Sequence, residues 1–271
     1  MTFPNEKFGI LPDRMNDYVN MIKSGRENMK KSRVILLGLA RDLEPMLISS
    51  MNMFENLANM FKDYRILIYE NDSVDKTVNI LNMWQKKNSR VRILSESLSW
   101  PKYGQVKDLD RTTKMAYYRN QLLQVVKKEC SDLPEYVCIA DMDMLSWCPQ
   151  GIATTFSDVN LNLNWDMVGS YGVWFRGKEQ IHFDSWAYRM VGANTRHQDQ
   201  HINKLVFYRG QPLQRLWSCF GGLAFYKTTS ILTAEYEGYD CEHVCLHNNM
   251  RKHGCENIFM NPNQITIYLK H

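Results

Sequence analysis

The first hundred residues switch repeatedly between two hydrophobic patterns. Continuous apolar runs at 32–40, 64–69 and 91–94 are typical of strands buried on both faces. Between them, 43–61 and 78–87 carry apolar residues three and four positions apart, which predicts helices. A chain that alternates strand and helix in this way predicts a parallel, right-handed α/β sheet. Ligands of such sheets bind outside the carboxyl ends of the strands.

A fourth unit follows and ends in two acidic residues. Residues 113–128 have the apolar spacing of an amphipathic helix, and the apolar run from Tyr136 reaches Asp141 and Asp143. Residues i and i+2 of a strand point the same way, so both carboxylates would emerge together at its carboxyl end. Two like charges there are costly without a cation, and a divalent metal with an anionic ligand would satisfy them. The alternative is that one carboxylate caps the next turn while the other is solvated.

The second half of the chain is richer in aromatic residues and loops. A helix at 242–252, ended by Gly254, is predicted there. Pro262 is expected to break the last apolar stretch, and the short strands predicted in this half are 167–169, 216–219, 222–226, 257–260 and 265–269. No repeat or linker interrupts the sequence. We therefore expect an arm with one short helix over 1–31 and one α/β domain over 32–271, with halves 32–145 and 146–271.

Composition narrows the class of protein. The 271 residues are 44% hydrophobic and 23% charged, with a net charge of +4 and no basic block, so nucleic-acid binding is not expected. The sequence has no apolar run of membrane-spanning length and no secretory signal at its start, which favours a cytoplasmic protein. The seven cysteines form no C-x-x-C pair, so reduced thiols are expected. A zinc site is a minor alternative. Its candidate ligands would be Cys241, His243, Cys245 and His247, and the spacing of these residues matches no standard zinc finger.

The order of the polar motifs resembles that of a known enzyme family. The motifs are an acidic turn, an Arg-Asn pair on a helix, the Asp-x-Asp segment, a Gly-Gly pair, a Glu-His helix start, a glycine and a proline, at 70–77, 119–120, 141–143, 221–222, 242–243, 254 and 262. Together they resemble the nucleotide-sugar-dependent glycosyltransferases of the GT-A fold, over roughly residues 32–271. Two segments, Phe183–Arg189 and Cys241–His247, look most like the fungal capsule-associated mannosyltransferases. Similar soluble enzymes are encoded by large DNA viruses of algae and amoebae.

The resemblance implies a fold and an activity. The fold would be a single GT-A domain with a Rossmann-like, mostly parallel sheet, in which 32–145 bind the nucleotide and 146–271 serve the acceptor and catalysis. The activity would be hexosyl or pentosyl transfer from a nucleotide-sugar, UDP-linked by preference and GDP-linked as the alternative. The acceptor would be a hydroxyl of a glycan or glycoprotein.

A divalent metal is also implied. By resemblance, Asp143 is the direct ligand, and Asp141 contacts the ribose, the metal or a metal-bound water. Oxygen ligands suit Mg²⁺ or Mn²⁺. The family often adds a late histidine, for which His271 is the candidate and His247 the rival. A histidine ligand would favour Mn²⁺.

Further residues acquire expected roles by resemblance. The turn of Glu70, Asn71 and Asp72 would hold the nucleobase and ribose, unless it only caps the following helix. Arg41 would face the base or a phosphate, unless it forms a surface ion pair. Arg119 would lie near the donor, unless it is a structural ion-pair partner.

The acceptor half supplies the remaining candidates. The glycines Gly221 and Gly222 would lie beneath the donor sugar, where the absence of a Cβ permits close approach, or else form a bulge. The segment with Asp184, Trp186 and Arg189 would bind sugar hydroxyls by resemblance.

The resemblance also implies a catalytic base. An acidic residue at the start of the last helix deprotonates the acceptor in inverting members, which implicates Glu242. His243 stands where the family has a second acid, so it would contact the acceptor and is an alternative base, as is Asp199. We expect inversion, because the sequence offers no convincing buried nucleophile.

Two other classes of protein compete with this interpretation. A nucleotidyltransferase acting on sugar phosphates also uses an α/β sheet and acidic pairs, but it usually needs a Gly-rich loop with a lysine after the first strand, and this chain has Gly-Leu-Ala-Arg-Asp there. A non-catalytic sugar-binding module could use the aromatic residues, but it would not need Asp141 and Asp143.

Overall fold

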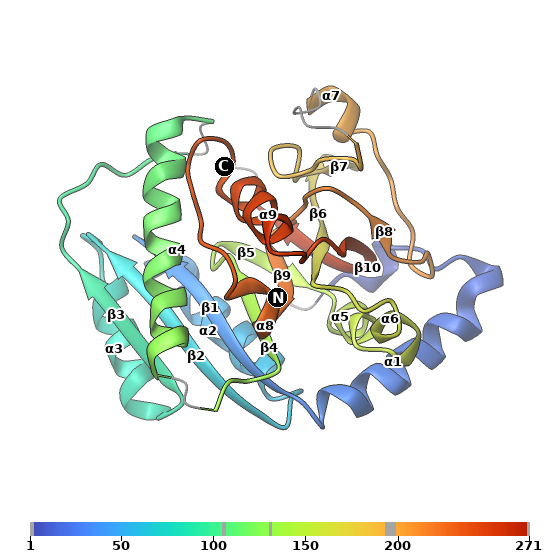
Figure 1. The fold of residues 1–271 in the computed structure, drawn as a ribbon, viewed down its shortest axis with the longest axis horizontal. Coiled ribbons are helices and arrows are strands. Elements are labelled where there is room, and N and C mark those ends of the chain that lie inside the picture. The colour runs from blue at the N-terminus through green and yellow to red at the C-terminus, as the bar shows by residue number, and fades with distance from the viewer. Residues whose placement is uncertain (1–2, 105–106, 130–131, 193–198, 270–271) are drawn as a thin grey trace.

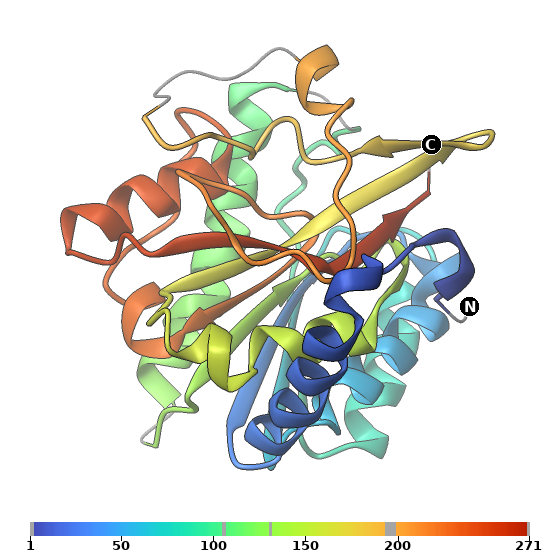
Figure 2. The same cartoon turned by 90° about the vertical axis from the view of Figure 1, so that its right-hand side faces the viewer.

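The protein is a single sheet covered by helices on both faces. The structure is a computed structural model that describes residues 3–104, 107–129, 132–192 and 199–269. Helices α4 and α9 cover one face of the sheet, and α1, α2, α3 and α5 lie on the other (Figures 1 and 2). The hydrophobic core is correspondingly divided into two clusters, one on each side of the sheet.

The described strands form one ten-stranded mixed sheet. Its hydrogen-bonded order is β3-β2-β1-β4-β9-β6-β10-β5, with β7 added to β6 and β8 added to β10. The strand bounds are β1 Arg33–Ala40, β2 Asp63–Asn71, β3 Val91–Glu96, β4 Tyr136–Ala140, β5 Met144–Trp147, β6 Met167–Arg176, β7 Glu179–His182, β8 Gln214–Arg215, β9 Leu223–Lys227 and β10 Ile258–Tyr268.

The described helices connect these strands. Two short 3₁₀ turns precede the first α-helix, at Asn5–Lys7 and Pro12–Arg14. The α-helices are α1 Met15–Met29, α2 Glu44–Ala58, α3 Thr77–Lys87, α4 Leu109–Glu129, α5 Pro149–Thr155, α6 Asp158–Leu161, α7 Asp199–Ile202, α8 Thr228–Ile231 and α9 Glu242–Lys252. The N-terminal arm therefore contains a helix of 15 residues, longer than expected, which packs against α5. None of the described helices is long and apolar enough to cross a membrane.

The parallel part of the sheet is the part that the apolar runs predict. Strands β3, β2, β1 and β4 run parallel to one another. Five consecutive residues of β1 are buried, because helices cover both of its faces, and this explains the uninterrupted apolar sequence. The predicted helices at 43–61, 78–87 and 242–252 are confirmed as α2, α3 and α9.

The second half of the sheet is mixed, and three local predictions need correction. Strand β9 is antiparallel to both β4 and β6, so the parallel arrangement stops at β4. The predicted strand at 216–219 is absent, and the chain there makes only a bridge between Ser218 and Arg189. Asp141 and Asp143 do not end a strand but form the three-residue turn between β4 and β5.

Pro262 does not break the last strand. It lies inside β10, which runs unbroken from Ile258 to Tyr268 with a shift of register between Asn261 and Ile265. A bulge at this shift takes the proline out of the regular ladder, so its missing N–H is not needed there. Helix α5 packs against this bulge through Gly151, where a Cβ would lie 1.5 Å from the carbonyl oxygen of Asn263.

Candidate functional site

The acidic turn lies at the carboxyl end of the parallel strands. Met142 is buried in the core between α2 and the sheet, while Asp141 and Asp143 on either side of it are half-buried. Burial is the main cause that raises the pKa of Asp141 to about 6, and the nearby charge of Asp143 adds to it. The two carboxylates therefore lie close together, as the i and i+2 spacing predicts, although on a turn.

One buried arginine connects this turn to the last helix. Arg119 of α4 donates from Nη2 to Asp141 at 3.3 Å and from Nε to Glu242 at 3.3 Å. Its side chain is 4% exposed and lies over the rings of Phe220 and Tyr236, with centroid distances of 5.3 and 5.9 Å. A single guanidinium thus neutralises part of the charge of two carboxylates that come from opposite halves of the chain.

A tyrosine that the sequence did not single out completes the contacts of Asp141. The hydroxyl of Tyr268, at the end of β10, donates to Asp141 Oδ2 at 2.9 Å. The backbone N–H of Asp141 donates to the carbonyl of Gly222 at 2.8 Å. Gly222 has a φ of +78°, and a Cβ on it would lie 1.9 Å from the Tyr268 hydroxyl. The predicted close approach at Gly222 is thus an approach to Tyr268 in this structure.

Asp72, in the turn after β2, binds the loop of residues 98–101. Asp72 has a φ of +53° and accepts from the backbone N–H groups of Leu98 and Ser99 at 2.8 and 2.9 Å. Arg41 donates to the carbonyls of Trp100 and Pro101, and its guanidinium lies 3.9 Å from Asp72. Both candidates therefore shape the 98–101 loop at the carboxyl ends of β1 and β2.

Glu70 and Asn71, which precede Asp72 in the turn after β2, are buried. Glu70 accepts from the N–H of Ser73 and from the Ser95 hydroxyl, while Asn71 donates to Tyr118 and Asp72. Their exposed fractions are only 1% and 3%, so they support the turn from inside. The turn and capping alternative describes Glu70 and Asn71 best.

A third carboxylate lies behind the glycine pair. Asp184 Oδ2 accepts from the N–H groups of Phe220 and Gly221 at 2.7 and 2.9 Å. Burial raises the pKa of Asp184 to about 7, although these two N–H groups oppose the shift. Gly221 has a φ of +65°, and a Cβ there would lie 2.0 Å from the carbonyl of Ser170. Asp184 thus fixes the glycine pair against β6.

The two other candidates of this segment differ in exposure. Trp186 is half-buried and has the guanidinium of Arg111 5.4 Å from its ring centroid. Arg189 is 1% exposed, pairs with Asp240 at 2.9 Å and donates to the carbonyls of Trp186 and Tyr188. The expectation that Arg189 binds sugar is corrected, because the protein itself surrounds the guanidinium. The ring of Trp186 is partly exposed, two residues after Asp184.

The start of α9 carries two buried titratable groups. Glu242 is its first residue and lies 3.7 Å from the Nε2 of His243. The imidazole of His243 stacks on Phe220 with 3.7 Å between ring centroids, and neither ring nitrogen has a hydrogen-bond partner in the described part of the chain. Burial, reinforced by the charge of Arg119, lowers the pKa of His243 well below its usual range. His243 is therefore a neutral imidazole whose two ring nitrogens are buried beside Glu242.

The remaining histidine candidates are not part of this cluster. Both ring nitrogens of His247 are engaged, by the hydroxyls of Ser218 at 2.8 Å and Tyr226 at 3.1 Å, and burial lowers its pKa to about 3. His247 is therefore corrected from a rival metal ligand to a core residue. His271 lies outside the described residues, as does the side chain of Asp199.

The acidic turn has the donor chemistry that a hard divalent cation requires. Within 3–104, 107–129, 132–192 and 199–269, no group of three or more His, Cys, Asp or Glu residues is placed to hold a metal ion, which also removes the zinc alternative for these residues. Asp141 and Asp143 remain as two candidate oxygen ligands, and the charge of Asp143 adds to the burial that raises the pKa of Asp141. Mg²⁺ is commonly bound through one or two carboxylates together with substrate phosphates. The acidic turn fits a cation bound in that way.

Comparisons with solved structures bear on the fold. No known family model and no curated protein sequence matches the chain. The fold is similar to a mannosyltransferase from Pyrobaculum calidifontis solved with GDP-Man and Mn²⁺, with a TM-score of 0.51 and 10% identity over 94% of this chain and 65% of that one. It is also similar to GalNAc-T7 solved with UDP, GalNAc and Mn²⁺, with a TM-score of 0.56 and 10% identity over 99% and 55% of the two chains.

These similarities define the class of fold. The chain has the mixed α/β fold of nucleotide-sugar glycosyltransferases. More particularly, the fold is of the GT-A type, as the sequence resemblance implied. The chain spans between 55% and 65% of the length of the two solved enzymes.

Proposed function

We propose that the protein is a metal-dependent glycosyltransferase that moves a hexosyl or pentosyl group from a nucleotide-sugar to a glycan hydroxyl. The observation that carries the proposal is the shared ion pair of Arg119, which places Asp141 and Glu242 on one guanidinium at the carboxyl ends of the parallel strands. A donor site and an acceptor site must adjoin in such an enzyme. Arg119 contacts both Asp141, which we propose for the donor site, and Glu242, which we propose for the acceptor site.

The donor side of the proposal uses the acidic turn. Asp143 and Asp141 would hold Mn²⁺ or Mg²⁺, whose charge stabilises the departing nucleoside diphosphate. Arg41 and Asp72 would contact the nucleotide from the loop that they shape. The sequence resemblance favours a UDP-sugar over a GDP-sugar as the donor. We also propose, from the same resemblance, that the protein groups with the fungal capsule-associated mannosyltransferases and the similar enzymes of large DNA viruses.

The acceptor side uses the start of α9. Transfer breaks the bond between the sugar and the diphosphate and forms a bond to the acceptor oxygen, whose proton must leave. We assign the proton to Glu242, with the neutral imidazole of His243 packed beside it. A direct displacement of this kind inverts the anomeric centre. Trp186 offers its ring to the acceptor sugar, and Asp184 acts by fixing Gly221.

Calorimetry tests the proposal. UDP and GDP are each titrated into the protein with and without Mn²⁺, and into Asp143→Asn and the remote surface variant Asp158→Asn. We expect binding of one nucleotide that requires Mn²⁺, survives in Asp158→Asn and falls at least about tenfold in Asp143→Asn. Equal weak heats in every cell, or metal-independent binding that survives Asp143→Asn, would refute the metal-dependent transferase. Donor hydrolysis by the wild type, lost in Glu242→Gln with nucleotide binding retained, checks the base.

A further inference from the structure

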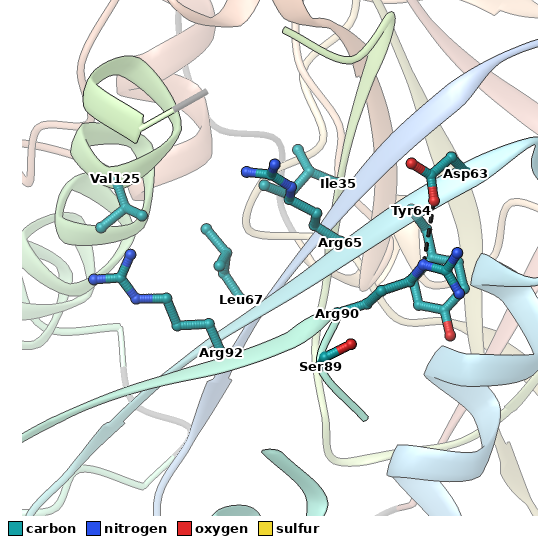
Figure 3. Close-up of a pocket in the computed structure, with 9 residues that line it drawn as sticks. All are labelled: Ile35, Asp63, Tyr64, Arg65, Leu67, Ser89, Arg90, Arg92 and Val125. Atoms are coloured by element: carbon teal, nitrogen blue, oxygen red, sulfur yellow. Dashed lines mark ion pairs between the residues drawn. The ribbon is translucent and has the colours of Figure 1, made fainter. Parts of the chain in front are cut away.

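Arg111, in the first turn of α4, is a half-buried arginine that no acidic side chain holds. Among the described residues, its guanidinium has no hydrogen bond and no ion pair, and it lies over the ring of Trp186 at 5.4 Å from the centroid. By contrast, Arg90 pairs with Asp63 at 3.2 Å in the pocket drawn in Figure 3, and Arg119 is shared by two carboxylates. A cation that is partly removed from water gains from an anionic partner. Arg111 therefore has the capacity to bind an anionic ligand.

Arg111 lies beside the segment that leads into the last helix. Thr112 donates from its hydroxyl to the carbonyl of Gly238 at 2.8 Å, and a Cβ on Gly238 would lie 2.4 Å from the Cα of Thr113. The segment before α9 is thus packed directly against the first turn of α4. Burial is the main cause that lowers the pKa of His243, and the charge of Arg111 contributes to this shift. The guanidinium therefore acts on the start of α9.

A second set of contacts ties Trp186 to the same region. Arg189 donates to the carbonyl of Trp186 at 2.7 Å and to the carboxylate of Asp240 at 2.9 Å. Asp240 precedes Glu242, the proposed base, by two residues. The Trp186 ring, the guanidinium of Arg111 and the start of α9 therefore adjoin, although they come from three segments that are distant in the sequence.

The position of Arg111 along α4 separates it from the proposed metal site. Eight residues lie between Arg111 and Arg119, which corresponds to about 12 Å along the helix axis. Arg119 contacts Asp141, whereas Arg111 lies over Trp186, whose ring we propose for the acceptor sugar. The unpaired cation is therefore placed on the acceptor side of the site.

A guanidinium beside an indole ring matches a sugar that carries an oxyanion. The carbon-bound hydrogens of a sugar ring can pack on an aromatic face, while a guanidinium binds a carboxylate or phosphate through two parallel N–H groups. The contact with Trp186 leaves these donors available, because no hydrogen bond in the described part of the chain uses the guanidinium of Arg111. A neutral sugar would leave the charge of Arg111 without a partner.

We infer that Arg111 and Trp186 form a subsite for an acidic sugar residue of the acceptor, in which the guanidinium binds a carboxylate or phosphate group and the indole ring packs on the sugar. The acceptor class is then an anionic glycan. The assignment of the ligand as the acceptor rests on the proposed function, whereas the binding of an acidic sugar does not.

Calorimetry with matched acidic and neutral sugars tests the inference. Trisaccharides of glucuronate, galacturonate and mannuronate are each compared with their methyl esters, which lack the charge, and glucose 6-phosphate is compared with glucose. The first set reports a carboxylate ligand and the second a phosphate ligand. We expect the wild type to bind at least one acidic sugar about tenfold more tightly than its neutral counterpart.

Three variants identify the groups that bind the acidic sugar. Arg111→Gln should abolish the preference for the acidic sugar and retain the binding of its neutral counterpart, because only the charged contact is lost. Trp186→Ala should weaken both. The matched control is Arg26→Gln, which removes an exposed arginine from α1 on the other face of the sheet and should keep the wild-type preference.

Each remaining outcome decides the question. The inference is overturned if the wild type does not prefer any acidic sugar, if the preference survives Arg111→Gln, or if Arg26→Gln loses as much of it. Equal loss of acidic and neutral binding in Arg111→Gln also overturns it, because the role is then structural.

Binding of UDP and GDP with Mn²⁺ is measured on the same proteins. If Arg111→Gln weakens nucleotide binding and leaves the preference for the acidic sugar unchanged, the guanidinium serves the donor and the inference falls. If no nucleotide binds while acidic-sugar binding depends on Arg111, the proposed transferase fails and the acidic-sugar subsite stands.

Discussion

The hydroxyl of Tyr268 donates a hydrogen bond to the carboxylate of Asp141 at 2.9 Å, across the ends of β10 and β4. The two residues are 127 positions apart in the sequence. Strand β10 is separated from β4 by β9 and β6 in the hydrogen-bonded order. The contact therefore links two strands that are not neighbours, at the candidate metal site. The orientation of Asp141 therefore depends on the correct placement of the last strand.

The first prediction concerns this hydrogen bond. Burial raises the pKa of Asp141 to about 6, and the Tyr268 hydroxyl opposes the shift. Tyr268→Phe removes that opposition and raises the pKa further. Because a metal ligand must be deprotonated, Mn²⁺ affinity should rise with pH through about 6 in the wild type, and this rise should move to higher pH in the variant.

Manganese titrations between pH 5 and 8 measure this shift. We expect roughly tenfold weaker Mn²⁺ binding by Tyr268→Phe near pH 6, from the loss of a hydrogen bond to a charged group. Tyr136→Phe, at the opposite end of β4, is the control and should follow the wild-type curve. Superimposable curves for Tyr268→Phe and the wild type would show that the hydroxyl does not influence Asp141.

The second prediction separates two glycines with the same backbone conformation. Gly222 and Gly254 have φ values of +78° and +80°, but a Cβ would meet the Tyr268 hydroxyl at 1.9 Å in the first and nothing within 4 Å in the second. Both alanine variants should lose about 1 kcal/mol of stability from backbone strain. Only Gly222→Ala should in addition displace Tyr268 and weaken Mn²⁺ binding. Equal metal affinity in the two variants would contradict the proposed packing.

The third prediction concerns the buried arginine. Arg119→Met leaves Asp141 and Glu242 without their shared cation, and breaking a buried ion pair costs about 3–5 kcal/mol. Chemical denaturation should show a loss of that order. Arg119→Met/Glu242→Gln should recover part of it, because one of the two unpaired carboxylates is gone. A double variant that is less stable than Arg119→Met would mean that Glu242 is stabilised by groups other than Arg119.

The fourth prediction is a pH dependence of stability. Burial raises the pKa of Asp184 to about 7 from an ordinary value of 3.8, so the folded protein holds a proton that the unfolded chain releases. The stabilising contribution is complete below about pH 4 and is lost as the pH rises to about 7, with a total of at most about 4 kcal/mol. Urea unfolding of the metal-free protein at pH 5 and pH 8 measures it.

Asp184→Asn is the informative variant for this pH dependence. The amide oxygen can still accept from Phe220 and Gly221, but the side chain no longer titrates. The change in stability from pH 5 to pH 8 should therefore be more favourable in the variant than in the wild type. The slope that remains belongs to Asp141, whose pKa is also raised, and to His243 and His247, whose lowered pKa values add stability as the pH rises. Parallel pH profiles for the two proteins would assign the whole effect to other groups.

Local sequence patterns predicted the parallel half of the fold because each element there carries its own signal. The apolar run at 32–40 is buried between two parallel neighbours, and the spacing in 43–61 matches a helix that covers them. The mixed half depends on pairings between distant segments, which leave weaker local patterns. Pro262 is an example: the low strand propensity of proline predicted that the strand would end there, but a bulge in β10 accommodates the residue.

The candidate site was predictable residue by residue but not as a network. Asp141, Arg119 and Glu242 were each singled out, yet their shared ion pair joins three elements that no local pattern relates. Tyr268 was missed because a tyrosine at the end of an alternating strand resembles any other core residue. Arg189 was misassigned because its motif resembles a sugar-binding segment, while its buried partner Asp240 is 51 residues away.

Strand β10 also sets the order in which the site can assemble. It pairs with β5, β6 and β8 and supplies the Tyr268 contact to Asp141, so the acidic turn cannot be completed before residue 268 has left the ribosome. The parallel strands and their helices can form earlier, since domains fold as their segments emerge and local contacts close fastest. A nascent chain that ends before β10 would thus hold the formed parallel strands with an unfinished candidate metal site.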